Sequence, residues 1–250
     1  MSPRWLRCRT PRAAARTRLV CFPHAGGSAS FFGTWGAGLP QDVELWAVQF
    51  PGREDRIADA VPASMAEVVA GVLADLGPLL DRPLALFGHS MGAVAAYEVA
   101  RALEARGEAP TRVFASARHA PDELVGGDIH LRDDAGLVEE VVRVGGAGAE
   151  VLKANPELWP VFLPAIRADY RVEETYRHLA GAPLRAPITA VVGEDDSEVT
   201  PAQAERWSDF TTGGFDLRVV PGDHFYPVRH NAMLLDLLTC QLNEVKDVLR

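Results

Sequence analysis

Short apolar runs alternate with longer stretches of helical periodicity along most of this chain. The apolar runs predict buried strands, and they cover residues 19–22, 45–50, 84–87, 113–116, 188–192 and 215–220. Between several of these runs, apolar residues recur at helical spacing. This alternation is typical of parallel sheets with crossover helices. The sequence therefore predicts an α/β fold with a mostly parallel, twisted sheet and helices on both faces.

One long segment, residues 121–183, interrupts the alternation. It contains no strand-like run, only helical patterns broken by glycines and prolines. An ordinary connection between a strand and a helix has roughly 2 to 6 residues. We therefore expect a helical lid insertion above the carboxyl ends of the strands, where open α/β sheets bind ligands. Residues 18–120 and 184–250 would form the core. Some aromatic residues of the insertion either line a ligand chamber or only attach the insertion to the core: Trp159, Phe162 and Tyr170.

Length and charge narrow the class of protein. The 250 residues are 48% hydrophobic, which is enough for one α/β domain with a substantial core. The formal net charge is −9, and without a basic stripe this argues against nucleic-acid binding. Residues 1–18 differ, with six arginines and no acidic residue. We expect residues 1–17 to be a disordered N-terminal extension.

Several further classes are disfavoured. No apolar run approaches the roughly 18 residues of a membrane span, and none resembles a secretory signal. The three cysteines lie far apart and have no metal-ligand spacing. Nucleotide-binding and zinc-protease motifs are absent from the sequence. We therefore expect a cytoplasmic monomer that contacts no membrane and uses no metal or cofactor.

The motif Gly-His-Ser-Met-Gly at residues 88–92 carries the clearest chemical information. Its G-x-S-x-G spacing follows a predicted strand and opens a helical pattern. In a nucleophile elbow, a serine occupies this strained turn, and glycine is needed where a Cβ would strike the neighbouring strand or helix. Ser90 is therefore the candidate nucleophile of a serine hydrolase.

A serine nucleophile needs a histidine to accept its proton and a carboxylate to orient that histidine. In this kind of fold the chain order is serine, acid, histidine. His224 follows the last predicted strand, whereas the other six histidines lie too early or at the start of a helix. The acid should follow the preceding strand, where Glu194, Asp195 and Asp196 all qualify by type. The loop pattern G-x-x-D-x-x-V favours Asp196, and Asp195 is the alternative.

The oxyanion formed during acyl transfer needs two backbone N–H donors. One candidate is Met91, the residue after the nucleophile. The other is Ala25, in the loop Phe-Pro-His-Ala-Gly-Gly that follows the first predicted strand. His24 of the same loop is better suited to stabilising the loop, or to contacting substrate, than to chemistry.

Together these motifs resemble the type II thioesterases that accompany modular polyketide synthases and nonribosomal peptide synthetases. The resemblance covers nearly all of the chain from Arg18 onward. The combination of Phe-Pro-His-Ala-Gly-Gly with Phe-Pro-Gly-Arg-x-Asp-Arg is specific to this group. The acid loop departs from the family pattern, because it has a second aspartate and lacks the usual proline after the acid. The resemblance rests on residues 19–27, 48–56, 88–92, 163–170 and 222–225.

The resemblance implies an α/β-hydrolase fold and a stand-alone enzyme. Its substrates would be stalled or wrongly primed acyl groups on the phosphopantetheine arm of acyl or peptidyl carrier proteins. Arg53 and Arg56, with insertion arginines such as Arg167 or Arg171, are candidates to bind an acidic carrier protein, or equally are solvated surface residues. The residues alone establish only serine acyl transfer to water. The alternatives are an esterase or lipase, a product-releasing thioesterase, and a non-enzymatic ligand-binding protein of the same fold.

Overall fold

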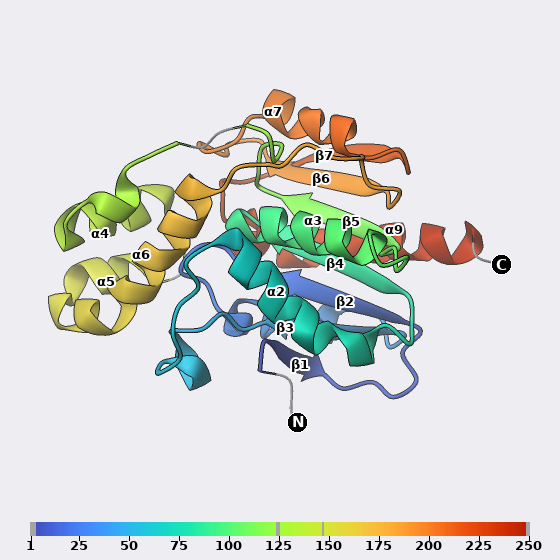
Figure 1. Cartoon of the computed structure of the whole chain (residues 1–250), viewed down its shortest axis with the longest axis horizontal. Helices are drawn as coiled ribbons and strands as arrows, with labels where there is room; N and C mark the ends of the chain where they lie inside the picture. Colours follow the sequence, from blue (N-terminus) through green and yellow to red (C-terminus); the bar gives the residue numbers. More distant parts are fainter. Residues whose placement is uncertain (1–3, 124–125, 147, 249–250) are drawn as a thin grey trace.

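A seven-stranded sheet forms the centre of the molecule (Figure 1). The computed structural model describes residues 4–123, 126–146 and 148–248. The strand order is β1-β3-β2-β4-β5-β6-β7, and all neighbouring pairs are parallel except β1 and β3. This confirms the predicted, mostly parallel α/β sheet. The strands are β1 (Leu6–Thr10), β2 (Thr17–Phe22), β3 (Val43–Val48), β4 (Leu84–His89), β5 (Arg112–Ser116), β6 (Ile188–Gly193) and β7 (Phe215–Val220).

Parallel pairing brings the carboxyl ends of the strands to one edge of the sheet. At this edge Phe22, the last residue of β2, pairs with Gly88 of β4. Further along, Gly193 at the end of β6 pairs with Val220 at the end of β7. The loops that follow β2, β4, β6 and β7 therefore meet at the same edge, although they are far apart in the sequence.

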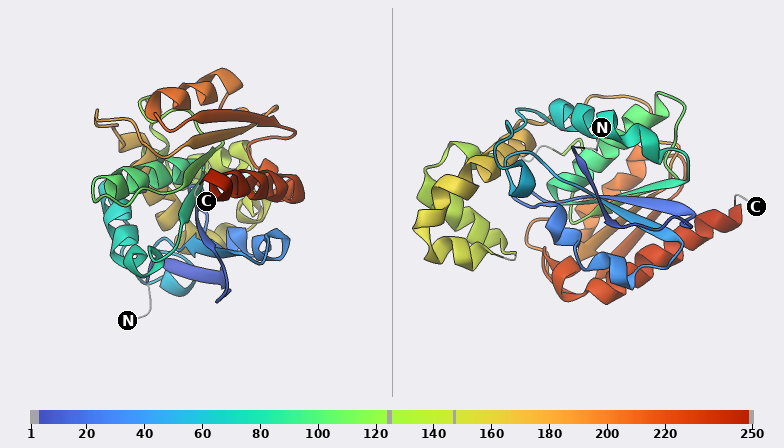
Figure 2. Two further views of the ribbon diagram at one scale, coloured as in Figure 1. Left: turned by 90° about the vertical axis from the view of Figure 1, so that its right-hand side faces the viewer. Right: turned by 90° about the horizontal axis from the view of Figure 1, so that it is seen from below.

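Helices cover both faces of the sheet (Figure 2). Alternate residues of β2 point to opposite faces, with Val20 and Phe22 in one apolar core and Leu19 and Cys21 in the other. Among the described helices, none is both long and apolar enough to span a bilayer. One face carries α2 (Met65–Leu76), α3 (Met91–Glu104) and α7 (Pro201–Glu205), and the other carries α1 (Trp35–Gly38), α8 (Tyr226–Arg229) and α9 (Asn231–Val248). Short 3-10 helices are η1 (Ala29–Phe32), η2 (Glu54–Arg56), η3 (Gly77–Leu79) and η6 (Arg206–Phe210).

The segment between β5 and β6, hereafter the insertion, projects beyond one end of the sheet (Figure 1). In the described part of residues 121–183 there is no strand. A small apolar cluster, made of Leu137, Val138, Leu152 and Leu163, packs its helices together. The elements are η4 (Ile129–Leu131), α4 (Asp134–Val144), α5 (Ala149–Ala154), η5 (Pro156–Leu158) and α6 (Trp159–Thr175).

The N-terminal residues contradict one prediction. Residues 1–17 were expected to be a disordered extension, but β1 pairs with β3 as an antiparallel edge strand. Leu6 is buried, and the guanidinium of Arg7 pairs with Asp55 at 2.6 Å. The core therefore includes β1, and residues 1–3 lie outside the described part. The run of arginines hides the strand pattern, because side chains of this type bury their stems while their charged ends find acceptors.

Candidate active site

Ser90 occupies the sharp turn between β4 and α3. Its backbone has φ 55° and ψ −122°, a conformation that is costly for a non-glycine residue and typical of functional sites. A Cβ on Gly88 would lie 2.1 Å from Gly92 O, and a Cβ on Gly92 would lie 2.3 Å from Phe22 O. The Ser90 N–H donates to Ser116 O at 2.8 Å, which attaches the turn to β5. Ser90 is thus held in the geometry of a nucleophile elbow.

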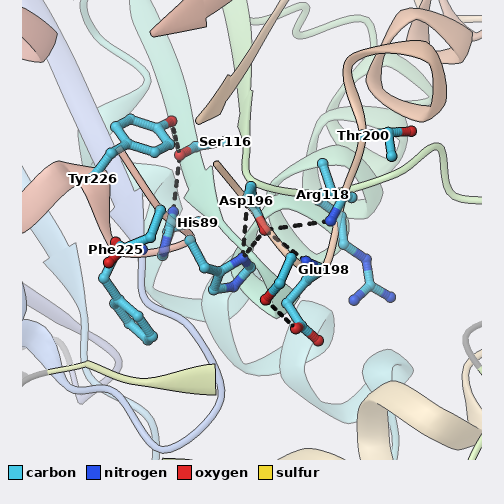
Figure 3. A network of polar contacts seen from close by, with 12 residues as sticks. His89, Ser116, Arg118, Asp196, Glu198, Thr200, Phe225 and Tyr226 are labelled. Carbon is cyan, nitrogen blue, oxygen red and sulfur yellow. Dashed lines mark hydrogen bonds and ion pairs between the residues drawn. The ribbon is translucent and has the colours of Figure 1, made fainter. Parts of the chain in front are cut away.

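Asp196 follows β6, His224 follows β7, and their side chains are in contact. His224 Nδ1 lies 3.0 Å from each carboxylate oxygen of Asp196. Both side chains are buried, with 5% of the histidine and none of the aspartate side chain exposed. Asp196 Oδ1 also accepts a hydrogen bond from the N–H of Glu198 at 2.8 Å, which orients the carboxylate (Figure 3). Asp195, the alternative acid, is exposed. The structure therefore brings Asp196 rather than Asp195 to the histidine.

The two candidate oxyanion donors flank Ser90. Met91 is the first residue of α3, where a backbone N–H has no acceptor within the helix. Ala25 lines the same cavity as Ser90 and His224. Within the described residues, neither N–H donates a hydrogen bond to another backbone group. Both are therefore available to an oxygen atom bound next to Ser90.

The cavity beside Ser90 has a volume of about 470 Å³. Most of its wall comes from the insertion and is apolar, with Leu152 and Ile166 as examples. Of the three aromatic residues predicted for a chamber, Phe162 and Tyr170 line the cavity. Trp159 packs instead in the apolar cluster of the insertion and donates its indole N–H to Leu152 O at 2.9 Å. For Trp159 the chamber alternative is therefore wrong, because this side chain attaches one insertion helix to another.

Two other histidines lie close to His224 and are held neutral. Burial, followed by the charges of His224 and Arg53, lowers the pKa of His24 to about 3. Burial, followed by the charges of His224 and His24, lowers the pKa of His89 well below its ordinary value. His24 also packs edge-on against Phe31, with ring centroids 4.8 Å apart. Of these three histidines, only His224 contacts a carboxylate among the described residues, and that carboxylate belongs to Asp196.

A hydrogen-bonded chain joins the nucleophile turn to the histidine loop (Figure 3). His89 Nδ1 lies 2.9 Å from Ser116 Oγ, and Ser116 Oγ is hydrogen-bonded to the hydroxyl of Tyr226. Tyr226 also donates to Val191 O at 3.3 Å. The sequence did not predict this series of hydrogen bonds, since Ser116 and Tyr226 are far apart in the sequence. The only available signal was that His89 directly precedes Ser90.

The arginines predicted to bind an acidic partner are mostly unavailable for that role. Arg53 is 6% exposed, and its two terminal nitrogens contact both carboxylate oxygens of Asp169 at 2.6 and 2.9 Å. Arg56 is 8% exposed and donates to an aspartate oxygen at 2.7 Å. The prediction is therefore wrong for these two residues, because a buried and paired guanidinium cannot reach a carboxylate of another protein. Arg167 pairs with a carboxylate of the insertion at 2.7 Å, whereas Arg171 is exposed.

Comparison with known proteins agrees with this geometry. Residues 17–240 match the family model described as a thioesterase domain. A probable cadicidin biosynthesis thioesterase of Streptomyces griseus is 43% identical over 227 residues, which are 91% of this chain and 63% of that protein. The chain thus spans less than two thirds of that relative. The gramicidin S biosynthesis protein GrsT of Aneurinibacillus migulanus is 33% identical over 244 residues, 97% of this chain and 95% of that protein.

Solved structures give the same answer. The type II thioesterase BorB from the borrelidin biosynthetic cluster has a TM-score of 0.89 and 39% identity, covering 97% of this chain and 99% of that one. YbtT, a type II thioesterase from the yersiniabactin pathway, has a TM-score of 0.87 and 33% identity, covering 96% and 99%. The expected α/β-hydrolase fold is thereby confirmed. The chain belongs to the thioesterase family and is a serine hydrolase of the type II group found in polyketide and nonribosomal peptide pathways.

Proposed function

We propose that this enzyme hydrolyses stalled or wrongly primed acyl groups from the phosphopantetheine arm of carrier proteins. The observation that carries the chemistry is the alignment of a buried Asp196 with His224 Nδ1, at 3.0 Å, in a site where a strained Ser90 opens onto an apolar cavity. This is the arrangement of groups that serine acyl transfer requires. The carrier-protein substrate is supported by the similarity to type II thioesterases.

Acylation begins when Ser90 Oγ attacks the thioester carbonyl and His224 Nε2 accepts the hydroxyl proton. The carbonyl oxygen becomes an oxyanion, and the N–H groups of Ala25 and Met91 stabilise its charge. Asp196 stabilises the imidazolium, which then gives its proton to the pantetheine sulfur as the carbon–sulfur bond breaks. The acyl group is left on Ser90 and the carrier thiol is released.

Deacylation repeats these steps with water. His224 takes a proton from a water molecule as the water oxygen attacks the carbonyl carbon of the acyl-serine. The N–H groups of Ala25 and Met91 stabilise the second oxyanion. The imidazolium then protonates Ser90 Oγ, and the carboxylic acid leaves. The apolar wall of the cavity suits a hydrocarbon chain, since contact with such a wall removes apolar surface from water.

The test is deacylation of carrier proteins loaded with acetyl, propionyl and longer acyl groups, followed by intact-protein mass spectrometry. We expect the wild-type enzyme to remove these groups and Ser90→Ala to leave them in place. Ser208→Ala, at an exposed serine of η6, is the matched control and should behave like the wild type. Cleavage of simple esters without deacylation of any carrier protein would contradict the proposal and favour a general esterase.

A further inference from the structure

One ion pair binds main-chain groups of the loop that carries Ala25. The turn is closed by a hydrogen bond from Gly27 N–H to His24 O at 2.9 Å. Gly26 N–H donates to Asp169 Oδ2 at 2.7 Å, and Arg53 Nη1 donates to Gly27 O at 2.8 Å. Gly26 N–H and Gly27 O, two main-chain groups just after Ala25, are therefore bound by the two members of one ion pair.

This pair joins two segments that are remote in the sequence. Arg53 lies in the loop after β3, and Asp169 lies on α6 of the insertion. The guanidinium and the carboxylate face each other as a bidentate pair, at 2.6 and 2.9 Å, and their side chains are 7% and 5% exposed. Arg53 is itself fixed, because its Nε donates to Pro51 O and its carbonyl accepts from Gln49 Nε2, both at 3.2 Å. A bidentate pair of this kind fixes the relative orientation of the guanidinium and the carboxylate as well as their distance.

The packing around the pair keeps α6 close to both loops. Gly26 has φ +77°, and a Cβ there would lie 3.1 Å from Ile166 on α6. Gly52 has φ +82°, and a Cβ there would lie 2.5 Å from Val61 and 3.3 Å from the Cβ of Ala165 on α6. At both glycines the main chain of the loop therefore approaches side chains of α6 closely.

We propose that Asp169 and Arg53 are positioning residues for the oxyanion hole, so that helix α6 helps to aim the Ala25 N–H. The inference rests on the proposed function, in which that N–H stabilises the oxyanion. A donor of this kind acts only when it lies about 2.7 to 3.1 Å from the developing oxyanion. Among the hydrogen bonds of the described residues, the main-chain groups of Gly26 and Gly27 would keep only the turn bond to His24 O if the pair were removed. The pair therefore acts on the transition state more than on substrate binding.

The experiment uses two variants, because Asp169→Asn leaves Arg53 buried beside a neutral partner and can unfold the chain. The double variant Arg53→Met with Asp169→Leu removes both charges together, which avoids an unpaired buried ion. We expect each folded variant to lose roughly 10- to 100-fold in kcat, the range for a misaimed rather than a missing donor.

Two inhibitors separate positioning from a structural role. An acyl-pantetheine trifluoromethyl ketone accepts Ser90 Oγ at its carbonyl carbon, with the serine proton passing to His224, and so forms a tetrahedral oxyanion. The corresponding thioether lacks the electrophilic ketone and reports ground-state binding alone. We expect the ketone to bind the variants less tightly by the same factor as kcat, with thioether binding within about twofold of wild type, since only the oxyanion depends on the donor.

Glu44→Gln is the matched control. Glu44 forms another buried pair with Arg18, at 3.0 Å and with side chains 10% and 9% exposed, near the start of β2 and β3 and far from the catalytic edge. The Glu44→Gln substitution should lower the urea concentration at the midpoint of unfolding without changing kcat per folded molecule. Equal weakening of ketone and thioether, or unchanged kcat in the folded double variant, would overturn the inference. A wild-type enzyme that forms no ketone adduct would overturn the proposed function instead.

Discussion

Replacing Gly92 with alanine should impair catalysis more than it impairs folding. Gly92 lies at the start of α3, and an added Cβ would sit 2.3 Å from Phe22 O and 2.6 Å from Pro23 O. Phe22 is the last residue of β2, and Pro23 is the first residue of the loop that carries Ala25. Real Cβ atoms essentially never approach closer than 3.0 Å, so the two backbones must separate by about 0.7 Å.

That separation moves Ser90 relative to the Ala25 N–H. Since a misplacement of about 1 Å can lower a rate roughly 100-fold, we expect kcat of Gly92→Ala to fall by about 10- to 100-fold. The free energy of unfolding should fall by about 1 to 3 kcal/mol, the usual cost of overpacking. KM should change little, because most of the cavity wall belongs to the insertion.

The assay is steady-state deacylation of an acyl carrier protein, with urea unfolding measured on the same preparation. Gly77→Ala is the matched control, because Gly77 is the C-cap of α2 with φ −47° and an added Cβ there meets nothing within 4 Å beyond its chain neighbours. Alanine at Gly77 should leave kcat unchanged and should not raise stability, because Pro78 follows and disfavours helical backbone at a residue that has a Cβ. Wild-type kcat in folded Gly92→Ala would refute the reasoning, since it would mean that α3 and β2 can separate without moving the catalytic groups.

Asp196→Asn keeps the shape of the side chain but removes its charge, so steady-state kinetics should show a loss of about 10³- to 10⁴-fold in kcat with little change in KM. His24 has a pKa of about 3 in the folded chain, whereas the unfolded chain gains a proton there below about pH 6.5. Urea unfolding should therefore show stability falling from pH 7 to pH 5, and falling less steeply in His24→Asn. Phe162 lines the cavity and is 46% exposed, so Phe162→Ala should raise KM for long acyl chains more than for acetyl, with stability unchanged within about 0.5 kcal/mol. Trp159→Phe, which loses the bond to Leu152 O, should lower stability by about 1 kcal/mol without changing KM.

Each of these expectations has a contrary outcome. A loss below tenfold in Asp196→Asn would mean that another group stabilises the imidazolium. Equal pH slopes for wild type and His24→Asn would mean that His24 is protonated in the folded chain. A chain-length-independent KM change in Phe162→Ala would place the acyl chain elsewhere, and a KM change in Trp159→Phe would bring that indole into contact with substrate.

Strands that consist of buried apolar residues could be predicted from the sequence alone. The run predicted at residues 188–192 differs from β6 by one residue, and every residue of β6 is buried. A strand covered on both faces is easy to recognise in the sequence because it has no polar alternation. β1 was missed for the opposite reason, since three of its five residues are charged or polar and Leu6 alone is fully buried there. The last strand, predicted at residues 215–220, coincides with β7, although β7 is an edge strand with exposed residues.

Some residues of the candidate site could likewise be predicted from the sequence, and others could not. Ser90 and His224 follow from local spacing, and the loop pattern after β6 identified Asp196 over Asp195. The environment of Arg53 did not follow from the sequence, because its partner Asp169 lies 116 residues away. Burial of a charged residue depends on which segments the fold brings together, and no local pattern around Arg53 contains that information. Its misassignment to the surface had this cause.

The strand order has a consequence for how the enzyme acquires activity during folding. The catalytic groups come from loops after β2, β4, β6 and β7, and every one of these strands pairs with a neighbour distant in sequence. Non-local pairings close long loops and form slowly. A chain whose last two strands have not docked would possess the elbow but neither the acid nor the base. Recovery of hydrolysis after dilution from urea should therefore lag behind recovery of helical circular dichroism, which makes turnover a reporter of the last step of folding.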